Sequence, residues 1–149
     1  MGQETEQKNS IFLVNVADVR VEDMEKKGAE KVQVQYLIDE RHGSERFALR
    51  LYTVQNGGHT PLDKHEYEHQ VHVISGRGLL KQSEEPNATP RELKPGDTIF
   101  IPSNAVHQFS NEHNEPFVFL CVKGNPKLYT HLKLGNAPTT SDETERNYC

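Results

Sequence analysis

Two separate stretches of this 149-residue chain place histidines among turn residues and short apolar runs, and they constrain its fold more than any other feature. Residues 57–76 read GGHTPLDKHEYEHQVHVISG, and residues 96–111 read GDTIFIPSNAVHQFSN. Asp63 and His65 are two residues apart, so both side chains leave the same face of an extended chain. A short turn at residues 66–68 followed by a second strand would aim His69 at the same point, where the apolar alternation of Val71 and Val73 begins.

The residue types in the two stretches suit a metal ion. Imidazole nitrogen and carboxylate oxygen ligate Mn, Fe, Ni, Cu and Zn. His107 ends the apolar run of the second stretch and supplies a further imidazole. We therefore predict that one divalent transition metal (Fe, Mn, Ni, Cu or Zn) binds to Asp63, His65, His69 and His107. Asp63 has a second interpretation, as a hydrogen-bond acceptor for the N–H of a ligand histidine.

Together the two stretches resemble the paired signature of the cupin superfamily, in its small single-domain (cupin 2) form. The positions that fall on the spacing of the two signatures are Gly57, Asp63, His65, His69, Gly76, Gly96, Pro102, Asn104, His107 and Asn111. Three of them depart from the usual residue: Asp63 replaces a histidine, His69 replaces a glutamate and Asn104 replaces a glycine. The first signature also allows one more intervening residue, which makes Gln70 a competing ligand, although Gln70 should point to the opposite face of its strand.

The pattern of short strands predicts an all-β barrel or sandwich. Turn signals recur every 8–12 residues, and no long helical period is present. Strands are expected at 11–16, 31–39, 46–54, 79–82, 98–101, 106–110, 116–123 and 128–132. The resemblance, which covers roughly residues 31–123, implies a double-stranded β-helix (the jelly-roll or cupin barrel). We expect a flexible N-terminus at 1–10, a single barrel domain at 11–133 and a disordered tail at 134–149.

Composition excludes several classes of partner. The chain carries 17 Lys and Arg against 22 Asp and Glu, for a net charge of −5, with no basic stretch that would favour nucleic acid. No apolar run approaches the ~18 residues of a membrane span. The N-terminus lacks a secretory leader, and two cysteines cannot build a disulfide framework, so we expect a cytoplasmic protein. The resemblance implies a homodimer that pairs through edge strands.

The predicted site suggests an enzyme acting on a small molecule. We favour a non-haem metal-dependent oxygenase, or a related enzyme, that acts on a small oxygenated organic molecule. The alternatives are a non-catalytic cupin that binds a sugar or carboxylate, and a sugar isomerase or epimerase. Tyr67, Glu68, His59 and metal-bound water are the candidate acid or base groups, and sequence does not rank them. Tyr52 and Arg50 are expected to face the interior, where Arg50 would suit an anionic substrate.

Overall fold

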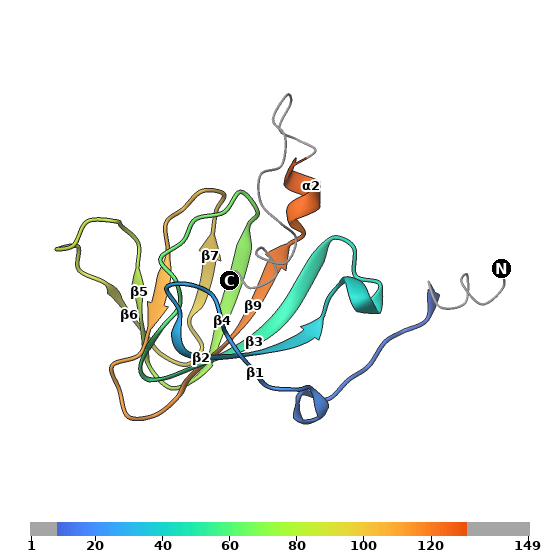
Figure 1. Ribbon diagram of the computed structural model, residues 1–149, viewed down its shortest axis with the longest axis horizontal. Coiled ribbons are helices and arrows are strands. Elements are labelled where there is room, and N and C mark those ends of the chain that lie inside the picture. The colour runs from blue at the N-terminus through green and yellow to red at the C-terminus, as the bar shows by residue number, and fades with distance from the viewer. Residues whose placement is uncertain (1–8, 131–149) are drawn as a thin grey trace.

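One antiparallel sheet of nine strands, curled on itself, makes up most of the computed structural model, which describes residues 9–130 (Figure 1). The strands are β1 (Glu22–Asp23), β2 (Glu30–Ile38), β3 (Phe47–His59), β4 (His69–Ser75), β5 (Gly78–Lys81), β6 (Arg91–Leu93), β7 (Thr98–Ile101), β8 (Gln108–Ser110) and β9 (Phe117–Gly124). The helical turns are η1 (Val16–Asp18), η2 (Glu40–His42) and α2 (Pro126–Thr130). In the described part of the chain, no helix has the length and hydrophobicity needed to span a bilayer.

The long strand β3 explains why the sheet curls. The strand order is β6-β5-β8-β3-β9-β4-β7, with β2 also paired to β3 and β1 paired to β2. Over most of its 13 residues β3 lies between β2 and β9, but its last residue, His59, pairs with Ser110 of β8. One strand thus crosses between the two halves of the sheet and closes them around a common interior. The all-β jelly-roll prediction is confirmed.

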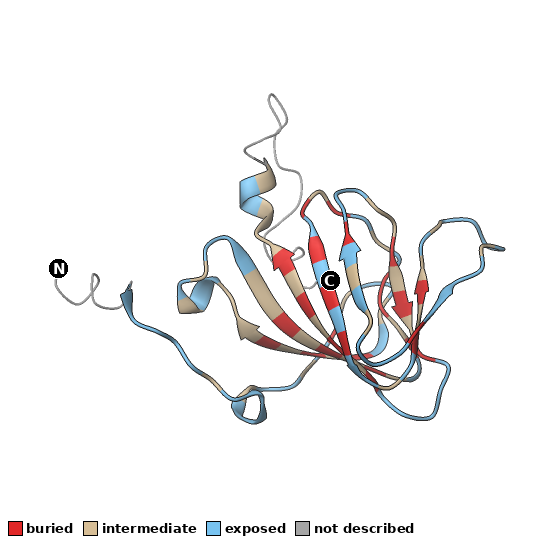
Figure 2. Ribbon diagram, turned by 180° about the vertical axis from the view of Figure 1, so that it is seen from behind, coloured by how far each residue is buried: buried red, intermediate tan, exposed pale blue. Residues whose placement is uncertain are grey.

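Every second side chain along the central strands points into this interior and fills it. In β9 every second residue is buried, beginning with Phe117 and Phe119, and β4 alternates buried and exposed positions in the same way (Figure 2). Tyr52, Phe109, Phe117 and Phe119 are fully buried and contact one another at ring-centroid distances of 4.7–6.5 Å. Burying each such ring stabilises the fold by roughly 1.5–3 kcal/mol.

Two turns require special backbone conformations. Gly76 has φ +75°, and a Cβ placed there would lie 2.0 Å from the backbone oxygen of Pro116, so only glycine fits. Asn104, at a position where the cupin signature usually has glycine, has φ +65°. Asparagine is one of the few residues that tolerate this left-handed region, which explains the substitution.

The strand predictions at the two ends of the described chain are wrong. Residues 11–16 form no strand: Ile11 is 95% exposed and Leu13 is 87% exposed, because no neighbouring strand in residues 9–130 pairs with them. At the other end, α2 replaces the strand expected at 128–132. The Asn125 side chain accepts a hydrogen bond from the Lys127 backbone N–H at 3.1 Å, and Pro126 begins the helix, as is common at helix N-termini.

Some of the expectations fall outside the described residues. The tail expected at 134–149, residues 131–132 of the last predicted strand, and all but two residues of the N-terminal segment 1–10 lie there. The domain boundaries at 11 and 133 therefore stay predictions.

Candidate metal centre

Three buried histidines converge at one end of the barrel interior. His69 begins β4, His65 lies in the β3–β4 connection and His107 immediately precedes β8. One ligand nitrogen from each ring lies within 4.8 Å of the other two. The side chains come from two segments about forty residues apart, and all three residues are at most 7% exposed. The structure therefore brings together the three imidazoles that the sequence singled out.

Backbone hydrogen bonds hold the two segments together. Asp63 and His107 form an isolated antiparallel bridge, with N–H···O distances of 3.0 and 2.9 Å. The backbone N–H of Asn104 donates to the carbonyl of His65 at 2.6 Å. In β4, His69 pairs with Ile101 of β7 on the opposite side from β9. The ring positions are thus set by main-chain pairing and not by the side chains alone.

The tautomer of His107 leaves a lone pair on Nε2, and a buried nitrogen of His69 has no hydrogen-bond partner in the described chain. The Nδ1 of His107 lies 2.9 Å from the carbonyl oxygen of Ala105, so Nδ1–H donates and Nε2 keeps its lone pair. The Nδ1 of His69 lies 3.6 Å from the Sγ of Cys121. The Nε2 of His69 is buried and has no hydrogen-bond partner among residues 9–130. A buried nitrogen of this kind is costly unless a ligand satisfies it, and a metal ion would do so.

Burial keeps two of the rings in the form that binds metals. It lowers the pKa of His65 to about 2, with smaller contributions from the positive charges of His107, Lys26, Lys123 and Arg50. Burial likewise lowers the pKa of His69 far below its ordinary value, with the neighbouring His107 and His65 adding to the effect. Both imidazoles are therefore neutral at physiological pH, as metal ligation requires.

Asp63 lies beside the three histidines but is oriented toward a different partner. Its Oδ2 forms an ion pair with the Nζ of Lys26 and lies 3.9 Å from the Nε2 of His65. The carboxylate does not join the convergent set of ligand atoms in the described chain. Sequence reasoning missed Lys26, because it lies 37 residues away in a charged, irregular segment and no local pattern indicates the contact. The role of Asp63 as a fourth ligand stays a prediction.

The other candidate residues point away from the three histidines. Gln70 is exposed on the outer face of β4, as predicted. His72 is exposed on the same face, and its Nδ1 contacts Thr98 Oγ1 at 2.8 Å. Glu68 is exposed, and His59 lies half-buried with its Nε2 3.7 Å from Glu30. These residues do not line the centre.

Tyr67 is the acid or base candidate that lies against the histidines. It is 3% exposed, and its ring stacks on that of His65 at a centroid distance of 4.7 Å with an interplanar angle of 2°. Its centroid lies 5.0 Å from that of His69. Among the three side chains that the sequence could not rank, Tyr67 is the one that contacts the histidine rings.

Two buried cations share the interior with this centre. Arg50 is 1% exposed, which confirms that it faces inward together with Tyr52. Lys123 is 6% exposed and lies directly across from His69 in the β4–β9 pairing. Sequence reasoning missed Lys123, although extending the alternation of Phe117, Phe119 and Cys121 by one step would have placed it on the inner face.

Known proteins share this arrangement of strands. The sequence profile of the cupin domain family matches residues 50–123. The 1-methylthio-D-xylulose 5-phosphate methylsulfurylase of Rhodospirillum rubrum is 32% identical over 90 residues, which cover 58% of this chain and 55% of that protein. The structure of the polyketide cyclase RemF from Streptomyces resistomycificus matches with a TM-score of 0.72 and 31% identity, covering 77% of this chain and 80% of that one.

A third protein supports the same assignment. A cupin 2 conserved barrel domain protein from Rhodopseudomonas palustris matches with a TM-score of 0.60 and 26% identity, covering 72% of each chain. The chain spans about half the length of the curated relatives it matches. Signature spacing, barrel topology and these similarities agree, and the chain belongs to the cupin family.

Proposed function

We propose that this cupin is a metal-dependent enzyme that acts on a small oxygenated organic molecule, with one divalent transition metal held by His65, His69 and His107. The observation that carries the proposal is the convergence of three buried imidazoles, whose ligand nitrogens lie within 4.8 Å of one another. The satisfied Nδ1 of His107 and the partnerless Nε2 of His69 fit a metal placed between the rings.

The donor set favours chemistry at a substrate oxygen. A divalent metal bound by neutral imidazoles would supply a Lewis acid that polarises such an oxygen. The hydroxyl of Tyr67 is the protein group that we assign to hold or move a proton beside the substrate. Tyr67 is buried and its ring stacks on that of His65, so it would exclude water from that side of a bound metal. A non-haem oxygenase is the first reaction class that we propose for this arrangement.

A non-oxidative cyclase is the second candidate, and a specific observation favours it. The RemF polyketide cyclase shares 31% identity across 77% of this chain. The interior also holds an aromatic cluster, in which Tyr52 stacks on Phe119 at 5.3 Å and Phe109 lies 4.7 Å from Phe119. These rings are fully buried and pack on one another in the core, so the similarity to RemF is the observation that carries this candidate. In a cyclase the same Lewis acid would activate a carbonyl without consuming oxygen.

Metal analysis tests the proposed metal site, and oxygen uptake tests the proposed class of reaction. Purified protein should bind about one divalent metal per chain, and His107→Ala should abolish this binding, whereas the exposed control His72→Ala should retain it. Equal metal content in the two variants would contradict the proposed centre. Oxygen uptake by iron-loaded protein, measured with diketones, flavonols and thiols, separates the reaction classes. Turnover of an aromatic polyketide analogue without oxygen uptake would instead support the cyclase.

We further propose that Asp63 can act as the fourth ligand by exchanging its ion pair with Lys26 for the metal. The separation of 3.9 Å between its Oδ2 and the Nε2 of His65 makes this a short movement. Asp63→Asn should then weaken metal affinity by about tenfold or more, and Asp63→His should retain or tighten it. Unchanged affinity in both variants would show that Asp63 does not ligate.

A homodimer is the assembly that we propose. Ile11 and Leu13 are exposed in the N-terminal segment that precedes η1 (Figure 1). A second copy of the chain would cover these side chains. Sedimentation should show a dimer that Leu13→Ser weakens, and a monomeric wild type would contradict the proposal.

A further inference from the structure

The connection between β1 and β2 brings a lysine to the edge of the histidine cluster. Lys26 lies in this connection, and its Nζ forms an ion pair with the Oδ2 of Asp63. The same Oδ2 lies 3.9 Å from the Nε2 of His65. The side chains of Lys26 and Asp63 are 14% and 25% exposed, so the pair is partly shielded from water. A carboxylate beside the metal centre is therefore held by a cation of the protein itself.

Packing of the β1–β2 connection places Lys26 at this position. The Met24 side chain, at the start of the connection, is buried in the core. Further along, a Cβ at Gly28 would be in van der Waals contact with Pro61, at 3.5 Å. Pro61 lies two residues before Asp63, so the connection packs directly against the segment that carries the carboxylate. The ion pair thus joins two segments that already lie side by side.

The charge of Lys26 acts on the metal-binding rings. Burial is the main cause of the lowered pKa of His65, and the positive charges of His107 and Lys26 lower it further. A proton on His65 and a metal ion at His65 are cations in nearly the same place, so a charge that opposes one also opposes the other. Through its charge alone, Lys26 disfavours every divalent metal to a similar degree. A preference among metals needs a second effect.

The ion pair supplies that second effect, because it decides which donor atoms a metal meets. While Lys26 holds Asp63, the convergent ligand atoms in the described chain are three imidazole nitrogens. Imidazole suits zinc, copper, iron and nickel, whereas carboxylate and other oxygen ligands suit manganese. A metal gains the Asp63 oxygen only by displacing the Lys26 ammonium. Manganese depends on that oxygen more than zinc does, so the ion pair counts most against manganese.

We propose that Lys26 determines the metal specificity of this centre: by holding the carboxylate of Asp63 in an ion pair, it presents a donor set of imidazoles and favours zinc over manganese. Lys26 is a positioning residue, since it acts on the metal through Asp63. This inference rests on the proposed function and specifies which metals its centre takes.

Titration of the full chain with zinc and with manganese, each metal alone, tests this role. Competition with a colorimetric chelator gives the dissociation constant of zinc, and the EPR signal of free Mn²⁺ gives that of manganese. Lys26→Met should tighten manganese by about tenfold or more and zinc by less, so the preference for zinc over manganese falls. The ratio of the two constants is the decisive quantity, because the change in charge acts on both ions alike and cancels.

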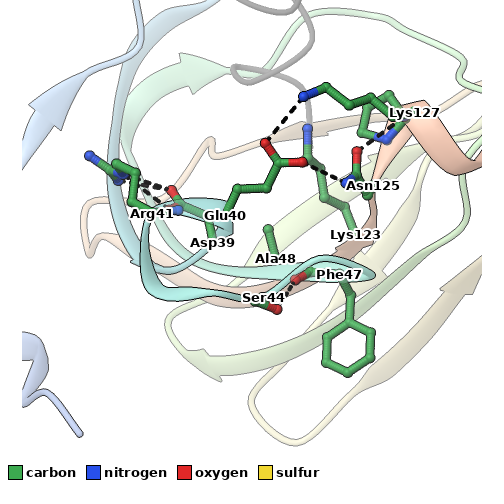
Figure 3. A pocket seen from close by; sticks show the side chains of 10 residues that line it. Asp39, Glu40, Arg41, Ser44, Phe47, Ala48, Lys123, Asn125 and Lys127 are labelled. Atoms are coloured by element: carbon green, nitrogen blue, oxygen red, sulfur yellow. Dashed lines mark hydrogen bonds and ion pairs between the residues drawn. The ribbon is translucent and has the colours of Figure 1, made fainter. Parts of the chain in front are cut away.

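A second lysine–carboxylate pair of the chain provides a matched control. The Nζ of Lys127 lies 3.4 Å from the Oε2 of Glu40, and both residues line a pocket of about 230 Å³ (Figure 3). Among the described residues, neither Asp63 nor any of the three histidines lines this pocket. Lys127→Met therefore breaks an ion pair of the same kind outside the metal centre, and it should leave the metal preference unchanged.

Three further variants test whether Lys26 acts through Asp63. Lys26→Arg keeps a cation that pairs with a carboxylate, so it should retain the wild-type preference. Asp63→Asn removes the carboxylate, and adding Lys26→Met to it should no longer change the preference. Lys26→Gln is a second neutral variant, which keeps the test valid should Lys26→Met fail to fold.

The outcomes separate this inference from the metal centre itself. A wild-type preference that persists in Lys26→Met, or that shifts as much in the Asp63→Asn background, overturns the role of Lys26 and leaves the centre intact. Failure of both wild type and Lys26→Met to bind either metal refutes the proposed centre and this inference together. A loss of preference in Lys26→Met that Lys26→Arg and Lys127→Met do not share supports both.

Discussion

Acidifying the metal-free protein from pH 7 to pH 5 should lower its free energy of unfolding by about 4 kcal/mol, because of two buried imidazoles. Burial lowers the pKa of His65 to about 2, and it lowers that of His69 as well, so both rings stay neutral in the folded protein throughout this range. In the unfolded chain each ring regains its ordinary pKa of ~6.5 and takes up a proton as the pH falls. Because the unfolded state binds more protons, stability is full above about pH 6.5 and declines below it.

The size of the effect depends little on how far the folded pKa values are lowered. Each pKa unit corresponds to ~1.36 kcal/mol, and pH 5 lies about 1.5 units below the ordinary histidine value. Each ring therefore contributes roughly 2 kcal/mol of lost stability at pH 5, or about 4 kcal/mol for the pair. Any folded pKa well below 5 gives the same result in this window, so the prediction requires only that both rings remain neutral.

Urea unfolding followed by circular dichroism, with a chelator present, would measure the change at pH 7, 6 and 5. His65→Gln should remove about half of the pH dependence, because one of the two buried rings is gone. His72→Gln replaces an exposed ring and should leave the dependence unchanged. A loss of less than about 1 kcal/mol in the wild type, or an unaltered slope in His65→Gln, would refute the reasoning.

Three further substitutions have defined outcomes. The side-chain amide of Asn111 is buried and donates to two carbonyl oxygens, at 3.0 and 2.8 Å, so Asn111→Ala should cost roughly 2–3 kcal/mol in urea unfolding; a cost near zero would contradict this role. Gly76→Ala should cost more than Gly43→Ala, because both have positive φ but only Gly76 has a backbone oxygen within 2.0 Å of the added Cβ; equal melting temperatures would argue against it. Cys121→Ala removes the thiol beside His69 Nδ1 and should weaken zinc affinity by about tenfold, because the thiol helps to orient that ring. Zinc titration would measure this change. An unchanged dissociation constant would show that the thiol does not position the ring.

The central strands could be predicted because their residues alternate. The expected strand at 98–101 has the observed bounds of β7, and those at 31–39 and 116–123 differ from β2 and β9 by one residue at each end. The predicted strand at 46–54 stops short of the true end of β3, which continues through Gly57 and Gly58 to His59. A Cβ on Gly58 would lie 2.7 Å from the carbonyl oxygen of Glu30, so this glycine permits close strand packing and does not end the strand.

The predicted strand at 11–16 is wrong because the segment has no pairing partner in the described chain. Its apolar residues resemble a strand, but a strand needs a partner, and within residues 9–130 this segment pairs with none. Apolar alternation indicates the capacity to pair and cannot say whether a neighbour is present.

By itself the sequence determined the class of fold and the identity of the three histidines, because both follow from local spacing: a period of two along strands, and fixed distances within two short motifs. Only the tertiary structure decided which charges surround those histidines. It paired Asp63 with Lys26, stacked Tyr67 on His65 and set Lys123 across from His69. Contacts of this kind depend on strand register and on chain segments far apart in sequence, and no periodicity within either segment encodes them.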